Sequence, residues 1–462
     1  MSTTSELRRL ASHIEGDVST QSDQAHSERR RVFYGEFNER EPAAVVAVAN
    51  ASDVSKAVVF AMESDMSLVV QGGGHSVLGH STTDGGLILD LSRLKGLDID
   101  ADGRNAWAGG GLLAGEYTKA TAEHGLVTGF GDTPTVGVTG ITLGGGVGFL
   151  HRKLGLTLDS VLGAEVVTAD GQVRLIDEEN DPDLFWAIRG GGGNFGVVTK
   201  LHFSLYPLDT VLGGMIILPA TPETVANFVE IAENASDDMS AIAGVALAPP
   251  LPFLPAEVHG RLILLGVVVH AGPPEIGESE VGQIRKLATP LLDGIENIPY
   301  PAIYEEEGGP PNPNAVSGRS FFSDEFSVDD AAAAIDALEV STAPMSVIQL
   351  RVLGGAVARV PAETTAFAHR DRKMIVNVIS GFDEVGDRPE HEEWVSATRQ
   401  RLQHGEGGVY INFHADDSEA AVREAYPGST WDRLVDVKTK YDQANLFSSN
   451  HNIPPIGTES GG

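Results

Sequence analysis

The stretch QGGGHS at residues 71–76 decides the fold, and it ends an apolar run that is predicted as a strand over Ser67–Gln71. Three successive glycines allow positive φ and let backbone N–H groups approach a bulky anionic ligand without Cβ atoms in the way. A phosphate-bearing ligand is therefore expected here. The alternative is an ordinary glycine-rich turn at a strand end, with His75 merely hydrogen-bonded to it.

The residues on both sides of this stretch predict one mixed α+β unit. From Pro42 the chain reads as a strand, then as a helix that begins near Ser52 with Asp53 in its first turn, which gives a βαβ-like start. Further short strands are predicted up to about residue 200, separated by glycine-containing turns: Leu87–Leu91, Ala106–Gly109, Ala164–Ala169 and Gln172–Ile176.

Two more glycine clusters follow. GFGDTPTVGVTGITLGGGVGFLHRKLG at 129–155 has nine glycines in 27 residues, which suggests backbone laid against a large planar group, although a compact structural loop is the alternative. In DPDLFWAIRGGGGNFGVV at 181–198, glycines 191, 193 and 196 satisfy GxGxxG. That fingerprint needs a strand before it and a helix after it, whereas here a helix precedes and a β-run follows. A nicotinamide dinucleotide fold is therefore not predicted.

The carboxyl end contains Tyr410-Ile411-Asn412-Phe413, which is interpreted as a strand. Alternation in a strand would place Tyr410 and Asn412 on one face, with Ile411 and Phe413 on the other. This pattern indicates the boundary between a core and a site. A tyrosine at the edge of a core, with no chemical role, is the alternative.

Composition excludes several classes of function. The chain has no cysteine, so disulfides, thiolate metal sites and cysteine nucleophiles are absent. A formal charge of −33 disfavours nucleic acid and anionic membranes as partners. The acidic residues are spread along the chain, as in a surface hydrated in concentrated salt, so a halophilic source is expected; an acidic ligand-binding face is the competing interpretation.

No apolar run is long enough for a membrane span, and the amino terminus lacks a secretory apolar core, so a cytoplasmic location is expected.

The second half predicts a separate domain built on an antiparallel sheet faced by helices. The predicted strands are Val211–Leu218, Leu262–Val269, Val347–Leu353 and Met374–Ile379, and the predicted helices are Pro222–Glu233, Val281–Ala288, Val328–Leu338 and Pro389–Gln403. The stretch at 308–318 is predicted as a surface loop, and the last six residues as a disordered tail.

The order of these clusters resembles the FAD-linked oxidases with the vanillyl-alcohol oxidase type fold, specifically the berberine bridge enzyme and 6-hydroxy-D-nicotine oxidase family. The resemblance covers about 40–208 and 410–455, and GGAVARVPAETTAFAHRD at 354–371 is also similar. It implies an α+β fold with a two-part FAD-binding domain, 1–208 and 413–462, and an inserted substrate domain, 209–412.

The resemblance also implies a cofactor and its contacts. FAD would be attached covalently through His75, by a single link, because Thr133 stands where many relatives have a second linking cysteine. Phe413 replaces the last tyrosine of the family's Y-x-N-Y strand. Implied FAD contacts are Gly72, Gly73, Gly74, Ser76 and Gly79 at the pyrophosphate, Thr139, Gly140, Gly144, Gly145 and Gly148 along the flavin, Asn194 and Val198 near the nucleotide, and Asn412 near the ring.

The predicted activity is oxidation of a small organic molecule. The substrate gives a hydride to the flavin, and the reduced flavin then passes the electrons to O2. A base on the substrate side must remove a proton, and Tyr410 is the first candidate. Gln349 and Arg351 share one strand face and could reach the pocket, although Arg351 could instead pair with a surface acid; His369 is a weaker candidate base. No metal site and no GxSxG hydrolase elbow is predicted.

Three classes of function remain open: an oxidase, a dehydrogenase with another electron acceptor, and a non-catalytic flavin-binding protein. An alcohol, a sugar and an amine are all possible substrates. The oligomeric state cannot be read from the sequence.

Overall fold

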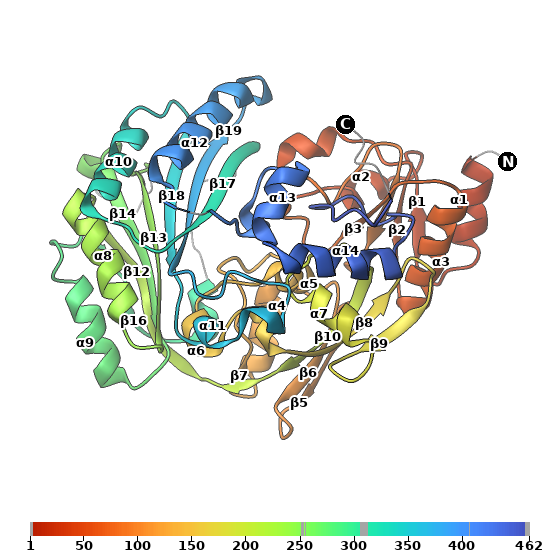
Figure 1. The fold of residues 1–462 in the computed structure, drawn as a ribbon, viewed down its shortest axis with the longest axis horizontal. Helices are drawn as coiled ribbons and strands as arrows, with labels where there is room; N and C mark the ends of the chain where they lie inside the picture. Colours follow the sequence, from red (N-terminus) through yellow and green to blue (C-terminus); the bar gives the residue numbers. More distant parts are fainter. Residues whose placement is uncertain (1–2, 251–253, 255, 305–312, 406, 458–462) are drawn as a thin grey trace.

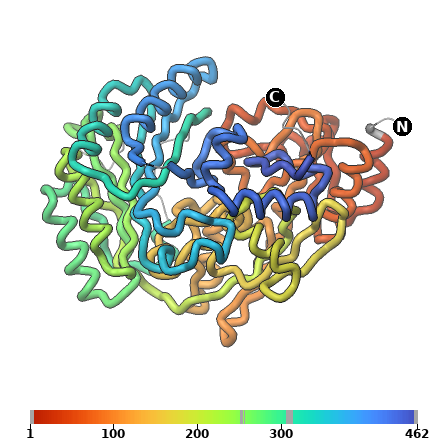
Figure 2. The backbone as a smooth tube through the Cα atoms, in the orientation of Figure 1, coloured from red at the N-terminus to blue at the C-terminus, as the bar shows by residue number. Residues whose placement is uncertain are grey.

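A computed structural model describes residues 3–250, 254, 256–304, 313–405 and 407–457. Figures 1 and 2 show two lobes: the amino-terminal part of the chain forms one, a large sheet with helices forms the other, and the carboxyl-terminal segment returns to the first lobe. Among the described residues, no helix is long and apolar enough to cross a membrane. The arrangement is α+β, as predicted.

The first lobe contains two main sheets and a small one. A four-stranded sheet has the order β1-β2-β4-β3, a five-stranded antiparallel sheet has the order β5-β6-β10-β8-β9, and β7 pairs with β11. The strands are β1 (Asp17–Ser19), β2 (Ala44–Ala47), β3 (Leu68–Gln71), β4 (Leu87–Asp90), β5 (Leu97–Asp100), β6 (Asn105–Gly109), β7 (Leu126–Val127), β8 (Val161–Val167), β9 (Val173–Ile176), β10 (Val197–Ser204) and β11 (Tyr206–Pro207). The helices are α1 (Thr3–Ala11), α2 (His26–Arg29), α3 (Ala51–Glu63), α4 (Ala114–Ala122), α5 (Val138–Gly144), α6 (His151–Leu154) and α7 (Pro182–Ile188).

Helix α3 shows why the βαβ start could be read from the sequence. Asn50 caps the helix, because its side chain accepts a hydrogen bond from the Asp53 N–H at 3.0 Å. The fully buried Asp53 carboxylate accepts hydrogen bonds from the N–H groups of Glu15, Gly16 and Ala49. These bonds replace the water that a buried carboxylate loses, and they tie the amino-terminal segment to β2.

The second lobe is one antiparallel sheet with the strand order β15-β12-β14-β13-β18-β19-β17, and β16 also pairs with β12. Its strands are β12 (Thr210–Pro219), β13 (Met239–Leu247), β14 (Leu262–His270), β15 (Leu292–Asp293), β16 (Glu296–Pro299), β17 (Ala315–Ser323), β18 (Met345–Val352) and β19 (Met374–Phe382). Helices on one face share a core with alternate strand residues: α8 (Pro222–Asn234), α9 (Pro274–Ile284), α10 (Val328–Glu339) and α12 (Arg388–Leu402). The opposite face is turned toward the first lobe (Figure 1).

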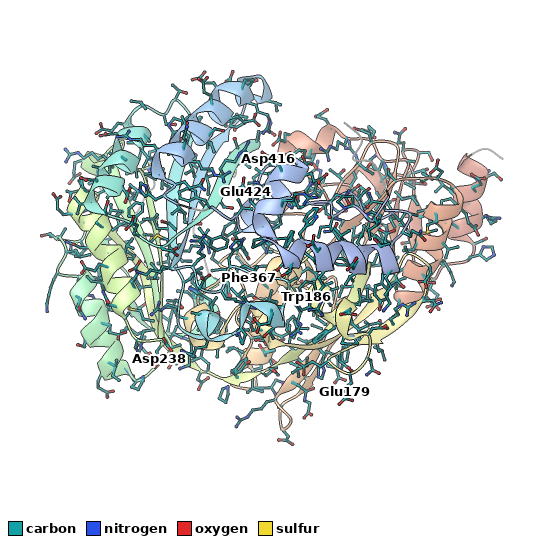
Figure 3. All side chains as sticks on the ribbon, viewed as in Figure 1. Glu179, Trp186, Asp238, Phe367, Asp416 and Glu424 are labelled. Atoms are coloured by element: carbon teal, nitrogen blue, oxygen red, sulfur yellow. The ribbon has the colours of Figure 1, made fainter. Side chains whose placement is uncertain are left out.

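The carboxyl-terminal segment packs onto the first lobe. It contains α13 (Glu419–Ala425) and α14 (Ser429–Tyr441), whose apolar residues share a core with α7. The segment with α11 (Ala356–Arg359) also joins the lobes: Trp186 Nε1 donates to the Glu363 carbonyl at 2.9 Å, and Phe367 lies near the middle of the molecule in Figure 3. The domain limits 1–208, 209–412 and 413–462 stay a prediction.

Four expectations from the sequence were wrong in detail. The helix expected at Val281–Ala288 is α9, which begins and ends earlier, because Pro273 and Pro274 start it. Strands β13 and β17 were missed, and β17 includes residues 315–318 of the stretch that was predicted as a loop; 308–312 lie outside the described residues. Most of the predicted disordered tail also lies outside them. Residues 411–413 form a 3₁₀ turn and not a strand.

Candidate active site

His75 is held by two contacts immediately after β3. Its Nε2 lies 3.0 Å from Thr135 Oγ1, and its ring stacks on Phe33 with centroids 4.1 Å apart. Burial lowers the pKa of His75 to about 4, so the imidazole is neutral at neutral pH. A hydrogen bond with the Thr135 backbone opposes the shift without cancelling it. A neutral imidazole is the form that can act as a nucleophile.

The glycines bring the first two clusters into contact. A Cβ atom at Gly73 would overlap the backbone nitrogen of Gly137, so only glycine lets these two segments approach this closely. Gly140 has open space on its side-chain side, and Gly72 has only the Gly110 carbonyl oxygen, at 3.9 Å. At these two glycines the backbone carries no side chain and has open space beside it, which is compatible with the predicted approach of a large flat group.

Tyr410 and Asn412 meet in a way that strand alternation did not predict. The 3₁₀ turn over Ile411–Phe413 curls the chain, so that Asn412 Nδ2 donates to the Tyr410 hydroxyl oxygen at 2.9 Å. The Gly146 N–H donates to the same oxygen at 2.8 Å, and Asn412 Nδ2 also donates to the Ile141 carbonyl. Burial raises the pKa of Tyr410, and these two hydrogen bonds oppose the shift without cancelling it. The phenol is therefore neutral at pH 7.

Arg351 forms a polar corner between the two lobes. Its guanidinium makes an ion pair with Asp132, donates from Nε to Gln349 Oε1 at 2.9 Å, and lies 4.7 Å from the centre of the Phe413 ring. Phe413 in turn packs edge-on against Tyr410. Arg351 is only 3% exposed, so its charge is compensated mainly by Asp132. Gln349, Arg351 and Tyr410 thus lie in one region. Arg351 pairs with an acid, which was the stated alternative, and its role and that of Gln349 in a substrate pocket stay predictions.

The remaining predicted cofactor residues make packing and hydrogen-bond contacts whose relation to a cofactor stays a prediction. Asn194 contacts the carboxyl-terminal segment, since its Nδ2 donates to the His451 carbonyl at 3.1 Å and its Oδ1 accepts from the Ile453 N–H. The side chains of Ser76 and Thr139 form hydrogen bonds, and Val198 is buried in the core. The close packing that excludes a Cβ atom is found at Gly79, Gly144, Gly145 and Gly148.

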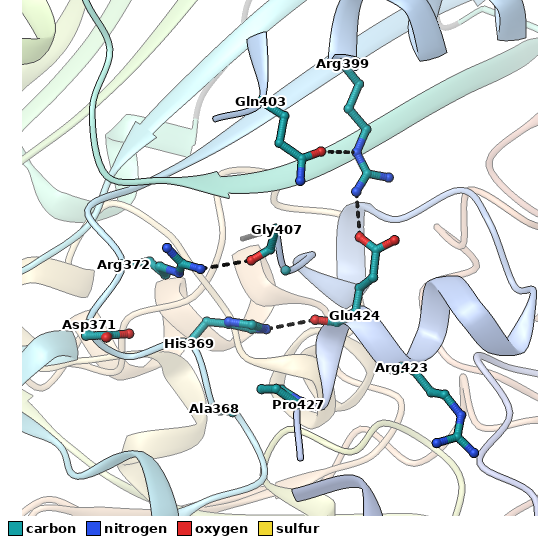
Figure 4. Close-up of a pocket in the computed structure, with 11 residues that line it drawn as sticks. Ala368, His369, Asp371, Arg372, Arg399, Gln403, Gly407, Arg423, Glu424 and Pro427 are labelled. Atoms are coloured by element: carbon teal, nitrogen blue, oxygen red, sulfur yellow. Dashed lines mark hydrogen bonds and ion pairs between the residues drawn. The ribbon is translucent and has the colours of Figure 1, made fainter. Parts of the chain in front are cut away.

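His369 lies away from this region. Its Nε2 is 3.1 Å from the Glu424 carbonyl oxygen, and it lines a separate cavity of about 860 Å³ between α12 and α13 (Figure 4). The Phe322 ring stacks on His369, and Phe367 lies between Phe322 and Tyr410. His369 is therefore a poor candidate for a base that must act beside Tyr410.

Sequence reasoning missed four residues of this region: Phe33, Thr135, Asp132 and Asn377. Each makes its contact with a residue far away in the sequence, such as Asp132 with Arg351 and Thr135 with His75. Thr135 lies two residues after Thr133, where many relatives are expected to have a second linking cysteine, and this was the only sequence feature that pointed to it. Among the described residues, no group of three or more His, Cys, Asp or Glu side chains could hold a metal ion.

Comparisons with known proteins agree with this geometry. The FAD binding domain family model matches residues 42–177, and the berberine and berberine-like model matches 409–454. An FAD-linked oxidoreductase of Bacillus subtilis is 30% identical, over 90% of this chain and 92% of its own. The chain belongs to the FAD-linked oxidoreductase family.

Two further relatives carry named activities. The crystal structure of 6-hydroxy-D-nicotine oxidase from Arthrobacter nicotinovorans superposes with a TM-score of 0.82 and 28% identity, over 95% of this chain and 98% of its own. A chitooligosaccharide oxidase of Gibberella zeae is 28% identical, over 90% of this chain and 88% of its own. This family member is an FAD-dependent enzyme with the vanillyl-alcohol oxidase type of fold, as the order of its motifs predicted.

Proposed function

We propose that this FAD-linked oxidoreductase is an oxidase that takes a hydride from a small organic alcohol, sugar or amine and passes the electrons to O2, with FAD attached by a single bond to His75. The observation that carries the proposal is that one short loop joins two chemical groups: Thr135 contacts the neutral His75 ring, and Asp132 pairs with Arg351, which lies in one region with Tyr410. When bound there, the flavin supplies the hydride acceptor.

The residues of the chain divide the remaining tasks. Residues 72–76 and Gly79 would hold the pyrophosphate, and Thr139, Gly140, Gly144, Gly145 and Gly148 would lie along the flavin. Asn194 and Val198 would lie near the nucleotide, and Asn412 near the ring. Relatives of known structure share this arrangement of segments, and the exposed backbone at Gly140 supports it.

Tyr410 would take the proton of the substrate O–H or N–H. Its hydroxyl oxygen already accepts hydrogen bonds from Gly146 and Asn412, and both bonds become stronger when that oxygen becomes negative. The positive charge of Arg351 also favours the phenolate. Burial opposes ionisation, so the base form would be populated only as the pH rises.

Two measurements test the proposal. The purified protein, precipitated with acid, should keep its yellow colour, whereas His75→Ala should release its FAD; release from the wild type would refute the tether. Peroxide should form in proportion to substrate oxidised during aerobic turnover. Turnover without peroxide, supported only by an artificial electron acceptor, would instead identify a dehydrogenase.

A further inference from the structure

The face of the large sheet that is turned toward the first lobe carries an ordered row of side chains. In the register of β14, β13 and β18, Leu265 lies opposite Gly244, and Gly244 lies opposite Gln349. Directly paired residues of an antiparallel sheet point to the same face. The next row, which includes Ile242 and Arg351, packs against the first lobe. The row with Gly244 is only half-buried and therefore borders open space.

Gly244 leaves a gap in this row. A Cβ atom there would meet Val347 Cγ1 at 3.6 Å and the Leu265 carbonyl oxygen at 3.8 Å, which are ordinary contacts, and no closer atom is present. Nothing in the packing of the sheet therefore requires glycine at this position. A glycine inside a strand weakens the strand, and it often marks a place where a ligand approaches the backbone.

The side chains around the gap are apolar. Met215, Leu265, Val347 and Ile379 are half-buried on this face. On β13, β14, β18 and β19, all of which the structure describes, this face carries no Asp, Glu, Trp or Tyr. Its one charged residue, Arg351, is already paired with Asp132. Such a surface offers few partners for the many hydroxyls of a sugar.

One end of the gap is polar. Asn377 lies directly opposite Gln349, is 5% exposed, and its Oδ1 has no hydrogen-bond partner among the described residues. Gln349 Oε1 is occupied by Arg351. On its other side Asn377 pairs with Ser320, whose hydroxyl is bonded to the backbone of Tyr410. Buried acceptors in native proteins are almost always satisfied by protein, water or a ligand, so this oxygen is a position where the donor of a ligand can be accommodated.

We propose that the substrate is an apolar, ring-bearing alcohol or amine with a single hydrogen-bond donor. Its ring lies over Gly244 between Leu265 and Val347. In the bound state its O–H or N–H donates to Asn377 Oδ1, beside the Tyr410 segment, and the same group turns to the Tyr410 hydroxyl oxygen when its proton is removed. This inference rests on the proposed function, and it selects among the alcohols, sugars and amines that the sequence left open.

The first test compares probes on the holoenzyme under anaerobic conditions. The flavin should be reduced by 4-methoxybenzyl alcohol or N-methylbenzylamine about 100-fold faster than by cellobiose or diacetylchitobiose at equal concentration. This is the discrimination that an apolar pocket reaches against an added hydroxyl, roughly 10². Faster reduction by either sugar would overturn the substrate class. If no probe reduces the flavin and acid releases it, the proposed function itself has failed.

The second test uses variants and a binding readout. Benzamide, a ring with an N–H donor, should perturb the flavin absorbance, and its Kd should rise about tenfold or more in Gly244→Leu, which fills the gap. Gly282→Leu, at an open position in α9, is the matched control and should leave that Kd unchanged. An unchanged Kd in Gly244→Leu would overturn the location of the ring.

Asn377→Leu tests the donor contact separately. Leucine is close to asparagine in size, and the lost oxygen has no partner within the described residues, so the thermal midpoint should not fall. The Kd of benzamide should rise about tenfold, the usual effect of one hydrogen bond. A lower thermal midpoint with an unchanged Kd would show that the Asn377 amide is structural, and it would overturn the contact.

Discussion

Removing the Tyr410 hydroxyl tests the centre of the proposed mechanism. In Tyr410→Phe the ring can keep its place against Gly145, but the Gly146 N–H loses its acceptor and Asn412 Nδ2 keeps only the Ile141 carbonyl. An unsatisfied buried donor costs about 1–3 kcal/mol, so the free energy of unfolding should fall by about 2–4 kcal/mol, less than two full penalties because Asn412 retains one bond.

Tyr117→Phe is the matched control for stability. Tyr117 is also fully buried, and its hydroxyl lies 3.0 Å from Thr128 Oγ1. Thr128 keeps its own bond to the Ser204 carbonyl, so the substitution leaves only an acceptor unpaired and should cost about 1 kcal/mol. Tyr117 lies in the core of the first lobe, and flavin reduction in this variant should match the wild type.

The rate and its dependence on pH decide whether Tyr410 is the base. Loss of a general base typically slows a reaction by about 10²–10⁴, so anaerobic flavin reduction in Tyr410→Phe should slow by that factor. Because burial raises the pKa of Tyr410, the wild-type rate should rise with pH through the range above neutrality. That rise should vanish in the variant. Stopped-flow rates within a few-fold of wild type, or an unchanged pH dependence, would refute the role of Tyr410 as base.

Three further predictions concern the tether and the stability of the chain. Thr135→Val should lower the fraction of acid-stable flavin without abolishing FAD binding, because it removes the partner of His75 Nε2; an unchanged fraction in denatured protein would contradict this. Stability should increase toward molar salt, where the Debye length falls to about 3 Å and repulsion within a chain of charge −33 is screened; a melting temperature that is already maximal in dilute buffer would argue against it. Burial lowers the pKa of His414 to about 4, so the neutral ring contributes fully to stability above pH 6.5. As the pH falls from 6.5 toward 4, the free energy of unfolding should fall by about 3 kcal/mol in total, because the unfolded state binds a proton first. His414→Leu should reduce this fall when the free energy of unfolding in urea is measured against pH.

The fold was predictable because its signals are local or ordered along the chain. Helix α3 has its cap at Asn50, β3 runs directly into the glycines of QGGGHS, and the order of the motifs identified the family. Strand β17 was missed because the sequence AVSGRSFFS mixes small polar residues with aromatic ones and lacks clear alternation. Pairing with β19 and contact with the carboxyl-terminal segment make it a strand, and neither can be read locally.

The site was predictable only in part, because most of its contacts join residues that lie far apart in the sequence. Tyr410 and Asn412 were expected to meet through strand alternation; they do meet, but through a 3₁₀ turn, because the chain must bring both polar groups to the Gly146 region. Asp132 could not be assigned, since an acid in a loop gives no sign of its partner 219 residues later. Asn377 was hidden within an apolar strand, where only the register shows that it faces Gln349.

One short loop connects the cofactor side and the substrate side of the site. Asp132 holds the large sheet through Arg351, and three residues later Thr135 contacts His75. Residues 132–135 therefore contribute to the separation between the His75 ring and the Gly244 row, together with other contacts between the lobes such as that of Arg152 with the Leu353 carbonyl. The resemblance implies a single flavin link, since Thr133 stands at the position of a second linking cysteine in many family members. The contacts of Thr135 and Asp132, and not a second covalent bond, therefore hold this loop between His75 and the sheet.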